Sequence, residues 1–144
     1  MIIKALAENT SVSEEYRAEH GLSIYIETGN HKLLFDTGRG GLFLENAEKM
    51  GVDLSKVDTA VISHGHYDHG GGLPYFLEIN QTAKIYIHKK AFGDYYSSRP
   101  DGTAYIGLDK NFKDHPQIIF TDEFWDALQP EKERPGKSKS KMLE

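Results

Sequence analysis

The sequence predicts a mixed α/β fold (α/β or α+β) that consists mostly of β-sheet, with a few helices outside the sheet. Six short segments are apolar or alternate apolar with polar residues, which is typical of strands. They are residues 2–7, 22–28, 31–36, 57–62, 84–88 and 117–121. Hydrophobic residues make up 38% of the 144 residues, which is enough to build the core of one domain.

Two further segments have the spacing of helices. Phe43, Ala47 and Met50 lie at i, i+4 and i+7, which predicts a helix over 42–50 that ends at Gly51. A second helix is predicted to begin at residue 73, because a proline follows at an early position and the apolar residues share one side. These helices are expected to pack on the sheet.

The connections are less regular than the strands. Gly29 and Asn30 form a two-residue turn of the kind that closes hairpins, so segments 22–28 and 31–36 are expected to pair. After the strand at 84–88 the sequence predicts a helix over 89–96, a loop over 97–102 and a short strand over 103–108. Residues 8–20 are polar and are expected to form a loop with a helical turn.

Cysteine is absent, which excludes disulfides and thiolate metal sites. Any metal must therefore be bound by nitrogen and oxygen atoms. The apolar run at the start of the chain is too short for a signal peptide and is followed too soon by an acidic residue. No apolar run approaches the length of a membrane span. We expect a cytoplasmic protein that does not bind membranes.

The net charge of −5 is unevenly distributed along the chain. Residues 129–144 contribute +2 and residues 1–128 carry −7. An acidic body argues against a nucleic-acid partner but allows a small anionic substrate. Residues 130–141 contain no apolar side chain, so we predict a folded part over 1–128 and a disordered charged tail over 129–144.

One motif after the predicted strand at 57–62 carries the chemistry. His64, His66, Asp68 and His69 lie within six residues and are followed by three glycines. Imidazole and carboxylate are ligands that zinc and similar metals prefer. In an extended segment His64 and His66 point the same way, Asp68 continues that face and His69 turns away, so the spacing allows a second ion beside the first. Chance clustering on a solvated loop is the alternative, but this context favours metal binding.

Two other candidates have a functional and an ordinary interpretation. Asp36 ends a predicted strand, where an aspartate is either a turn residue or a group that orients the histidine loop. Both interpretations of Asp36 remain open. His88 ends another strand, where an ordinary strand-end histidine is favoured over a site residue. His31 and His115 are expected to be exposed.

Several stretches together resemble the metallo-β-lactamase superfamily of metal-dependent hydrolases. Within it, they resemble the subgroup of dihydropterin-ribofuranosylaminobenzene-phosphate-synthase-like hydrolases. These stretches are Glu19-His20-Gly21-Leu22-Ser23, residues 33–38 (LLFDTG), residues 63–73 (SHGHYDHGGGL) and Tyr105-Ile106-Gly107-Leu108. The resemblance extends from the start of the chain to about residue 121, and the histidine loop is its most specific part.

The resemblance implies a fold and a set of roles. The fold would be the N-terminal half of an αββα sandwich, in which two sheets lie between outer helices. His64 and His66 would bind a first metal, Asp68 and His69 a second, and Asp36 would support the loop; Asp68 would also take part in catalysis. The metals would be zinc, two ions in a complete fold, with iron or manganese as alternatives. A metal-bound hydroxide would attack an ester, a phosphoester or a similar bond of a small-molecule substrate that the sequence does not identify.

The sequence also departs from the family pattern. The family takes a third histidine, a bridging aspartate and a final histidine from the second half of its fold, and this chain matches only the first half. We therefore expect the isolated chain to need a partner half or a second copy, which would cover an open apolar sheet face. A non-catalytic metal-binding remnant is the alternative. A di-iron redox protein is disfavoured, because such proteins usually carry Glu at the position of His66.

Overall fold

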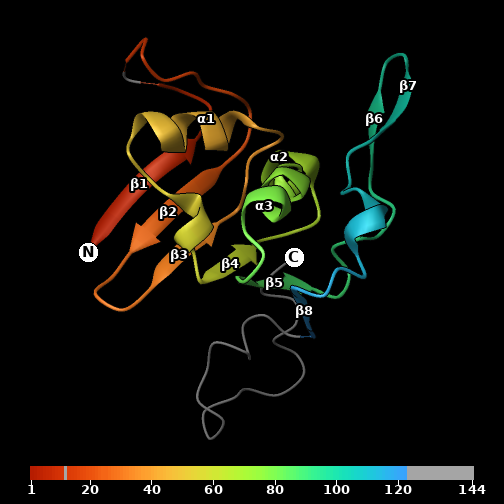
Figure 1. Ribbon diagram of the computed structural model, residues 1–144. Helices are drawn as coiled ribbons and strands as arrows, with labels where there is room; N and C mark the ends of the chain where they lie inside the picture. The colour runs from red at the N-terminus through yellow and green to blue at the C-terminus, as the bar shows by residue number, and fades with distance from the viewer. Residues whose placement is uncertain (12, 123–144) are drawn as a thin grey trace, which may run out of the picture.

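A six-stranded sheet forms the frame of the chain in the computed structural model, which describes residues 1–11 and 13–122. The spatial order of its strands is β1 (Ile2–Ala7), β2 (Ser23–Glu27), β3 (Lys32–Phe35), β4 (Thr59–Ile62), β5 (Lys84–His88) and β8 (Ile118–Thr121). The first three strands are antiparallel neighbours, and β3, β4, β5 and β8 run parallel (Figure 1). All six strands predicted from the sequence are confirmed, with small shifts at their ends.

The connections explain the two halves of the sheet. Thr28 donates its backbone N–H to the carbonyl oxygen of His31 at 2.8 Å, which closes the tight hairpin between β2 and β3. Parallel strands need a longer crossover. Helix α1 (Leu42–Lys49) provides it between β3 and β4, and α3 (Leu73–Ile79) provides it between β4 and β5. Both helices were predicted from their apolar spacing.

The core lies between the helices and one face of the sheet. Leu34, Ile62 and Ile85 point from the strands to this face and are at most 1% exposed. Phe43 of α1 and Phe76 of α3 cover them and are fully buried. Burial of these aromatic and aliphatic side chains is the main stabilising contribution to the fold.

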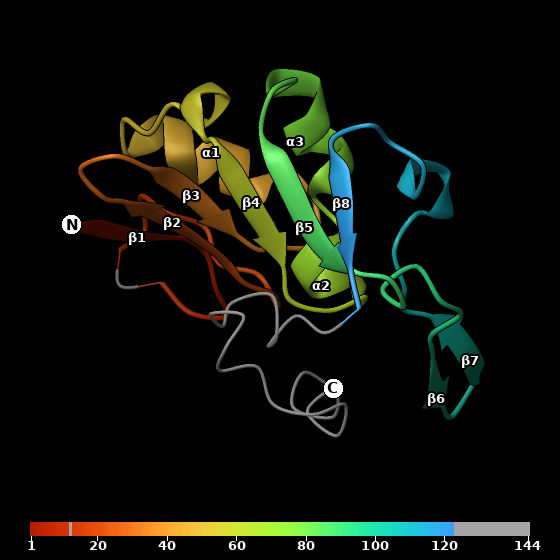
Figure 2. The same ribbon diagram turned by 90° about the horizontal axis from the view of Figure 1, so that it is seen from below.

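The opposite face of the sheet is also apolar. Register places one residue of each strand in a single row across this face: Ala5, Ile24, Phe35, Val61, Tyr86 and Ile119. Figure 2 shows the sheet from this side, with α1 and α3 behind the strands. The four central residues of the row are half-buried, Ile119 is 37% exposed, and Ile3 in the adjacent row is 64% exposed. No helix or second sheet of the described chain covers this face.

The histidine motif is only partly extended. The backbone is extended at His66, with φ −97° and ψ 144°, and a short helix α2 (Tyr67–Gly70) begins at the next residue. The predictions that Asp68 continues one extended face with His64 and that His69 turns away from it are therefore wrong. The helical turn instead brings Asp68 and His69 round to the same side.

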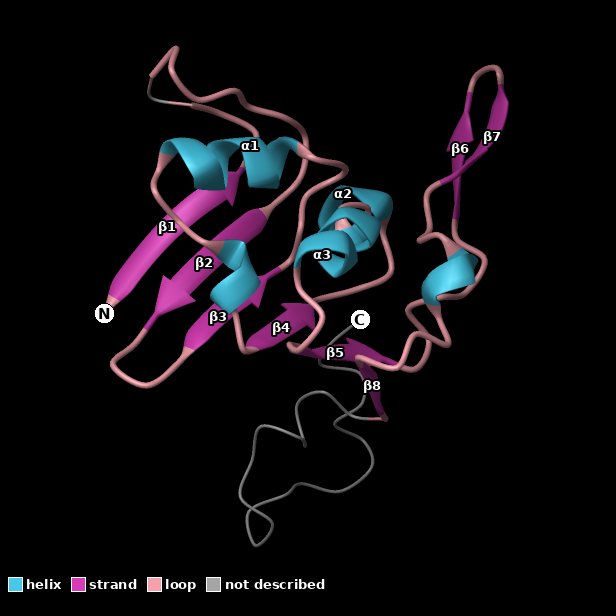
Figure 3. Cartoon of the chain, viewed as in Figure 1, coloured by secondary structure: helices cyan, strands magenta, loops and turns pink. Residues whose placement is uncertain are grey.

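A hairpin of β6 (Tyr96–Arg99) and β7 (Gly102–Tyr105) lies apart from the main sheet (Figure 3). The helix predicted over 89–96 and the loop predicted over 97–102 are therefore wrong. A backbone hydrogen bond from Gly93 to Lys90 makes a turn instead of a helix. The aromatic rings of Tyr96 and Tyr105 pack across the strands at 5.6 Å, a contact that favours sheet.

Two short 3₁₀ helices complete the described elements, η1 (Leu54–Lys56) and η2 (Lys110–Phe112). Within the described residues, no helix is both long and apolar enough to cross a membrane. The predicted boundary at residue 128 and the predicted disordered tail over 129–144 lie outside the described residues.

Asn80 provides a test of the fold, because its buried side chain joins the end of α3 to the segment before β4. Its amide nitrogen donates to the carbonyl oxygens of Leu54 and Val57 at 3.1 and 2.9 Å, and its oxygen accepts from the backbone nitrogen of Ala83 at 2.8 Å. Asn80→Ala leaves these groups unpaired, so we expect the free energy of unfolding to fall by about 2–3 kcal/mol in urea titrations. The exposed neighbour Gln81 serves as control, because Gln81→Ala should change the free energy of unfolding by less than about 0.5 kcal/mol. Equal effects of the two substitutions would contradict this account.

Candidate metal centre

The candidate site lies where the parallel strands β3 and β4 end. Asp36 directly follows β3, and Ser63 and His64 directly follow β4. The backbone nitrogen of Asp36 donates to the carbonyl oxygen of Val61 at 2.8 Å, which extends the ladder between the strands. Ligand sites of open α/β sheets form at this carboxyl edge. Parallel pairing therefore brings residues that are 27 positions apart into contact.

The carboxylate of Asp36 is the most constrained group of the site. Asp36 is completely buried and has φ 59°, a left-handed conformation that aspartate tolerates better than most residues. Its Oδ1 accepts from the backbone nitrogen of Ser63 at 2.7 Å. Its Oδ2 accepts from the Ser63 hydroxyl at 2.7 Å and from Nδ1 of His69 at 2.8 Å. This geometry favours the orienting interpretation of Asp36 over the simple turn residue.

These contacts also determine the direction of the protons. An ionised carboxylate only accepts hydrogen bonds, so the Ser63 hydroxyl and Nδ1–H of His69 both donate to Asp36. The Ser63 oxygen, whose proton is used, accepts from Nδ1–H of His64 at 2.8 Å. In both histidines Nε2 therefore carries the free lone pair. A buried carboxylate that sets the tautomer of metal-binding histidines is a recurrent arrangement in metalloproteins.

Three side chains form a group that suits a metal ion. One ligand atom each from His64, Asp68 and His69 lies within 4.8 Å of the other two. Two imidazoles and a carboxylate match the preferences of zinc and similar cations. Burial, followed by the nearby His69 and His66, lowers the pKa of His64 below its usual value. His64 is therefore neutral at pH 7, the form that binds metals.

His66, also predicted as a ligand, has a different environment. Its ring lies 4.7 Å from the ring of His64, centroid to centroid, but His66 is not part of the group of three. Its ring also packs against the ring of Tyr95, with 5.8 Å between the two centroids. The structure therefore brings together three of the four predicted ligands and places His66 next to them.

The glycines after the motif let two backbone segments approach closely. Gly72 donates its N–H to the hydroxyl of Thr37 at 2.9 Å, and a Cβ at Gly72 would lie 2.6 Å from the carbonyl oxygen of Thr37. Thr37 also donates its backbone N–H to the carbonyl oxygen of His69 at 2.7 Å. Thr37 and Gly72 thus fix the end of α2, and with it the direction of His69.

His20 is a site residue whose contact the sequence did not predict. Its Nε2 lies 3.0 Å from Oδ2 of Asp68, although the side chain is 64% exposed. The neighbouring Gly21 has φ 145°, and a Cβ there would lie 2.4 Å from the carbonyl oxygen of Asp68. The segment around His20 thus packs directly on α2. The glycine after His20 was the available signal, but nothing in the spacing linked it to a residue 48 positions later.

The remaining histidines do not join the group. Nε2 of His88 lies 2.6 Å from the carbonyl oxygen of Asp122. His31 is exposed and lies 3.3 Å from Asp58. His115 is half-buried instead of exposed, and its Nδ1 accepts from the backbone nitrogen of Gln117.

Sequence comparisons relate this chain to known proteins. A family model described as the metallo-beta-lactamase superfamily matches residues 16–136. An uncharacterized protein of Methanocaldococcus jannaschii is 37% identical over 115 residues, which are 79% of this chain and 43% of that protein. The 7,8-dihydropterin-6-methyl-4-(beta-D-ribofuranosyl)-aminobenzene-5'-phosphate synthase of the same organism is 29% identical over 119 residues, 78% of this chain and 40% of that protein.

A solved structure agrees with the sequence relatives. Tm1679, described as a metal-dependent hydrolase of the beta-lactamase superfamily, superposes with a TM-score of 0.65 at 33% identity. The match covers 84% of this chain and 42% of that one. The chain thus spans less than half the length of the relatives that it matches. Its sequence and its fold both show that it belongs to the metallo-beta-lactamase superfamily.

Proposed function

We propose that this chain supplies metal ligands of a hydrolase that cleaves an ester, a phosphoester or a similar bond in a small molecule. The observation that carries the proposal is the Asp36 network. It engages Nδ1 of both His64 and His69, which leaves Nε2 of each free to bind a cation, and a ligand atom of Asp68 lies within 4.8 Å of one on each ring. The description of Tm1679 as a metal-dependent hydrolase supports the same reaction class.

Each residue has a distinct part in this proposal. His64, Asp68 and His69 hold the cation, and His66 is a fourth ligand from the same loop. Zinc suits this donor set best, with iron or manganese as the next choices. When bound, the cation supplies a water acidic enough to act as nucleophile near neutral pH and stabilises developing negative charge. Asp36 keeps two imidazoles in the tautomer that leaves Nε2 free.

A second candidate function is metal binding without catalysis. It is favoured by the observation that the described residues bring no histidine from outside the motif into the ligand group. His20 contacts Asp68, but its ring is mostly exposed. Metal bound by one loop alone would be weaker and would have fewer groups to orient a substrate.

The open sheet face is a surface on which a second polypeptide could pack. Its row of apolar side chains needs a cover, which we propose to be a second copy of this chain when no partner half is present. Two residues of this row adjoin Asp36. Phe35 precedes it in the chain, and Val61 accepts a hydrogen bond from its backbone nitrogen. Covering the face would therefore also hold the strand ends that carry the ligands.

The metal content of the purified chain tests the proposal first. The wild type, purified without chelator or affinity metal, should contain stoichiometric metal by elemental analysis. His64→Ala removes one of the three grouped ligands and should lose most of it. His31→Ala, which changes an exposed histidine outside the group, should keep it. A wild type without metal, even after incubation with zinc, would refute the proposal.

The role of Asp36 is tested by a conservative change. Asp36→Asn keeps the shape but removes the charge and one acceptor, so it should weaken zinc binding about 10- to 100-fold in chelator competition. Asp58→Asn is the matched control, because Asp58 also contacts a histidine but on the exposed surface. If both variants bind zinc as the wild type does, Asp36 has no orienting role.

The proposed cover of the sheet is tested by solution mass. Analytical ultracentrifugation of the isolated wild type should find a dimer at micromolar concentration. Ile119→Lys places a charge on the open face and should give a monomer with unchanged circular dichroism. Tyr75→Lys, at an exposed position of α3, should leave the dimer intact. A monomeric wild type would exclude self-association through this face.

A further inference from the structure

The His66 side chain lacks the polar contacts that fix the other motif histidines. Among the described residues, no hydrogen bond involves its imidazole, whereas His64 and His69 each have one. Its ring instead packs against two aromatic rings. His64 lies at 4.7 Å with an interplanar angle of 82°, and Tyr95 lies at 5.8 Å with an angle of 80°. Both contacts are edge-to-face, a favourable arrangement for aromatic pairs.

We propose that Tyr95 is a positioning residue that holds the imidazole of His66 beside His64, ready to join the metal group. The inference rests on the proposed function, since it gives a part in metal binding to a residue outside the histidine motif. Because the His66 imidazole has no polar partner in the described chain, the rings of His64 and Tyr95 are the aromatic contacts that limit its rotation.

Tyr95 is itself held firmly enough for this task. Its hydroxyl donates to the carbonyl oxygen of Lys90 at 2.5 Å, which fixes the far end of the ring. Its own carbonyl oxygen accepts from the backbone nitrogen of Ile106 at 2.9 Å. Gly93 lies under the phenol, where a Cβ would be 3.2 Å from the hydroxyl oxygen. The Tyr95 side chain is therefore held by its hydroxyl group and by its own backbone.

The backbone near Tyr95 is also attached to the backbone near His66. Tyr67 donates its N–H to the carbonyl oxygen of Ile106 at 2.8 Å, and Ile106 is the residue that pairs with Tyr95. On the other side of His66, Gly65 approaches so closely that a Cβ there would lie 2.1 Å from the carbonyl oxygen of Ala91. These attachments fix the separation of the two loops, so the ring contact follows from the fold.

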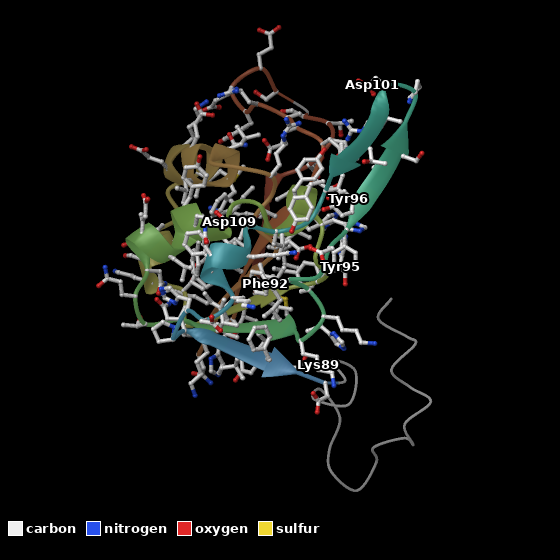
Figure 4. All side chains as sticks on the ribbon, turned by 90° about the vertical axis from the view of Figure 1, so that its right-hand side faces the viewer. Lys89, Phe92, Tyr95, Tyr96, Asp101 and Asp109 are labelled. Carbon is white, nitrogen blue, oxygen red and sulfur yellow. The ribbon has the colours of Figure 1, made fainter. Side chains whose placement is uncertain are left out.

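The adjacent tyrosine provides a matched control. Tyr96 follows Tyr95 at the start of β6, where successive side chains point to opposite faces. Tyr96 is 61% exposed and packs on Tyr105, whereas Tyr95 is half-buried and packs on His66. Figure 4 labels both residues where the chain enters the hairpin. A substitution at Tyr96 removes the same kind of side chain without touching the histidine.

The first measurement is the state of the His66 ring in the metal-free protein. Two-bond ¹H–¹⁵N correlation spectra report the ring signals of each histidine. Tyr95→Leu should shift and broaden the His66 signals, and Tyr96→Leu should leave them unchanged. A purely structural role of Tyr95 would alter many residues around it but would not single out His66.

The second measurement is metal affinity, determined with Zn²⁺ in competition with a chromophoric chelator. Tyr95→Leu should weaken binding about tenfold, the size expected for a residue that supports a ligand. Tyr95→Phe keeps the aromatic ring and should therefore keep most of the zinc affinity of the wild type. Tyr96→Leu should bind zinc as the wild type does. Cobalt substitution adds an absorption spectrum that should change in Tyr95→Leu only.

The outcomes separate this inference from the proposed function. A wild type that binds no metal refutes the proposed function, and the metal-free spectra still decide whether Tyr95 fixes the His66 ring. Unchanged His66 signals in Tyr95→Leu overturn the inference. So does a folded Tyr95→Leu protein that binds zinc as tightly as the wild type.

Discussion

The buried carboxylate of Asp36 is the constraint on which the site depends. A charge removed from water is tolerated only when hydrogen bonds replace its hydration. Asp36 obtains three such bonds, two from Ser63 and one from His69. Because Ser63 is next to His64, the bonds that compensate the buried charge also orient both histidines. The same hydrogen bonds thus stabilise the buried carboxylate and orient the two histidines.

The sheet makes this arrangement possible. Asp36 and Ser63 meet because β3 and β4 are parallel and end at the same level, and α1 is the crossover that makes them parallel. The histidine loop then bends away from the sheet as α2, whose end is fixed by Thr37. A loop that leaves a rigid strand can hold ligands more accurately than a free loop.

Features that depend on interactions between residues close in the sequence were predicted correctly, whereas contacts between residues far apart in the sequence were missed. The alternating strands, α1 and α3 depend on local periodicity and were found, as were the residue types of the metal motif. The contact of His20 with Asp68 and the support of His66 by Tyr95 depend on tertiary packing, which has no local signature. The segment around residues 89–99 was misassigned for a related reason. Its strand pairs with residues 102–105, and the carbonyl oxygen of Tyr95 accepts from the backbone nitrogen of Ile106. Neither contact has a local signal in the sequence.

The open sheet face and the ligand group share the same strands. Phe35 lies on the open face and is followed directly by Asp36, and Val61 lies beside it and accepts the hydrogen bond from the Asp36 backbone. A polypeptide that packs on these two side chains would reduce the motion of the strand ends that carry the site. An apolar cover would therefore affect ligand geometry even if it contributed no ligand of its own. We therefore expect assembly and metal binding to be coupled. If the covered chain binds metal more tightly, the metal-bound chain must by linkage associate more tightly with its partner.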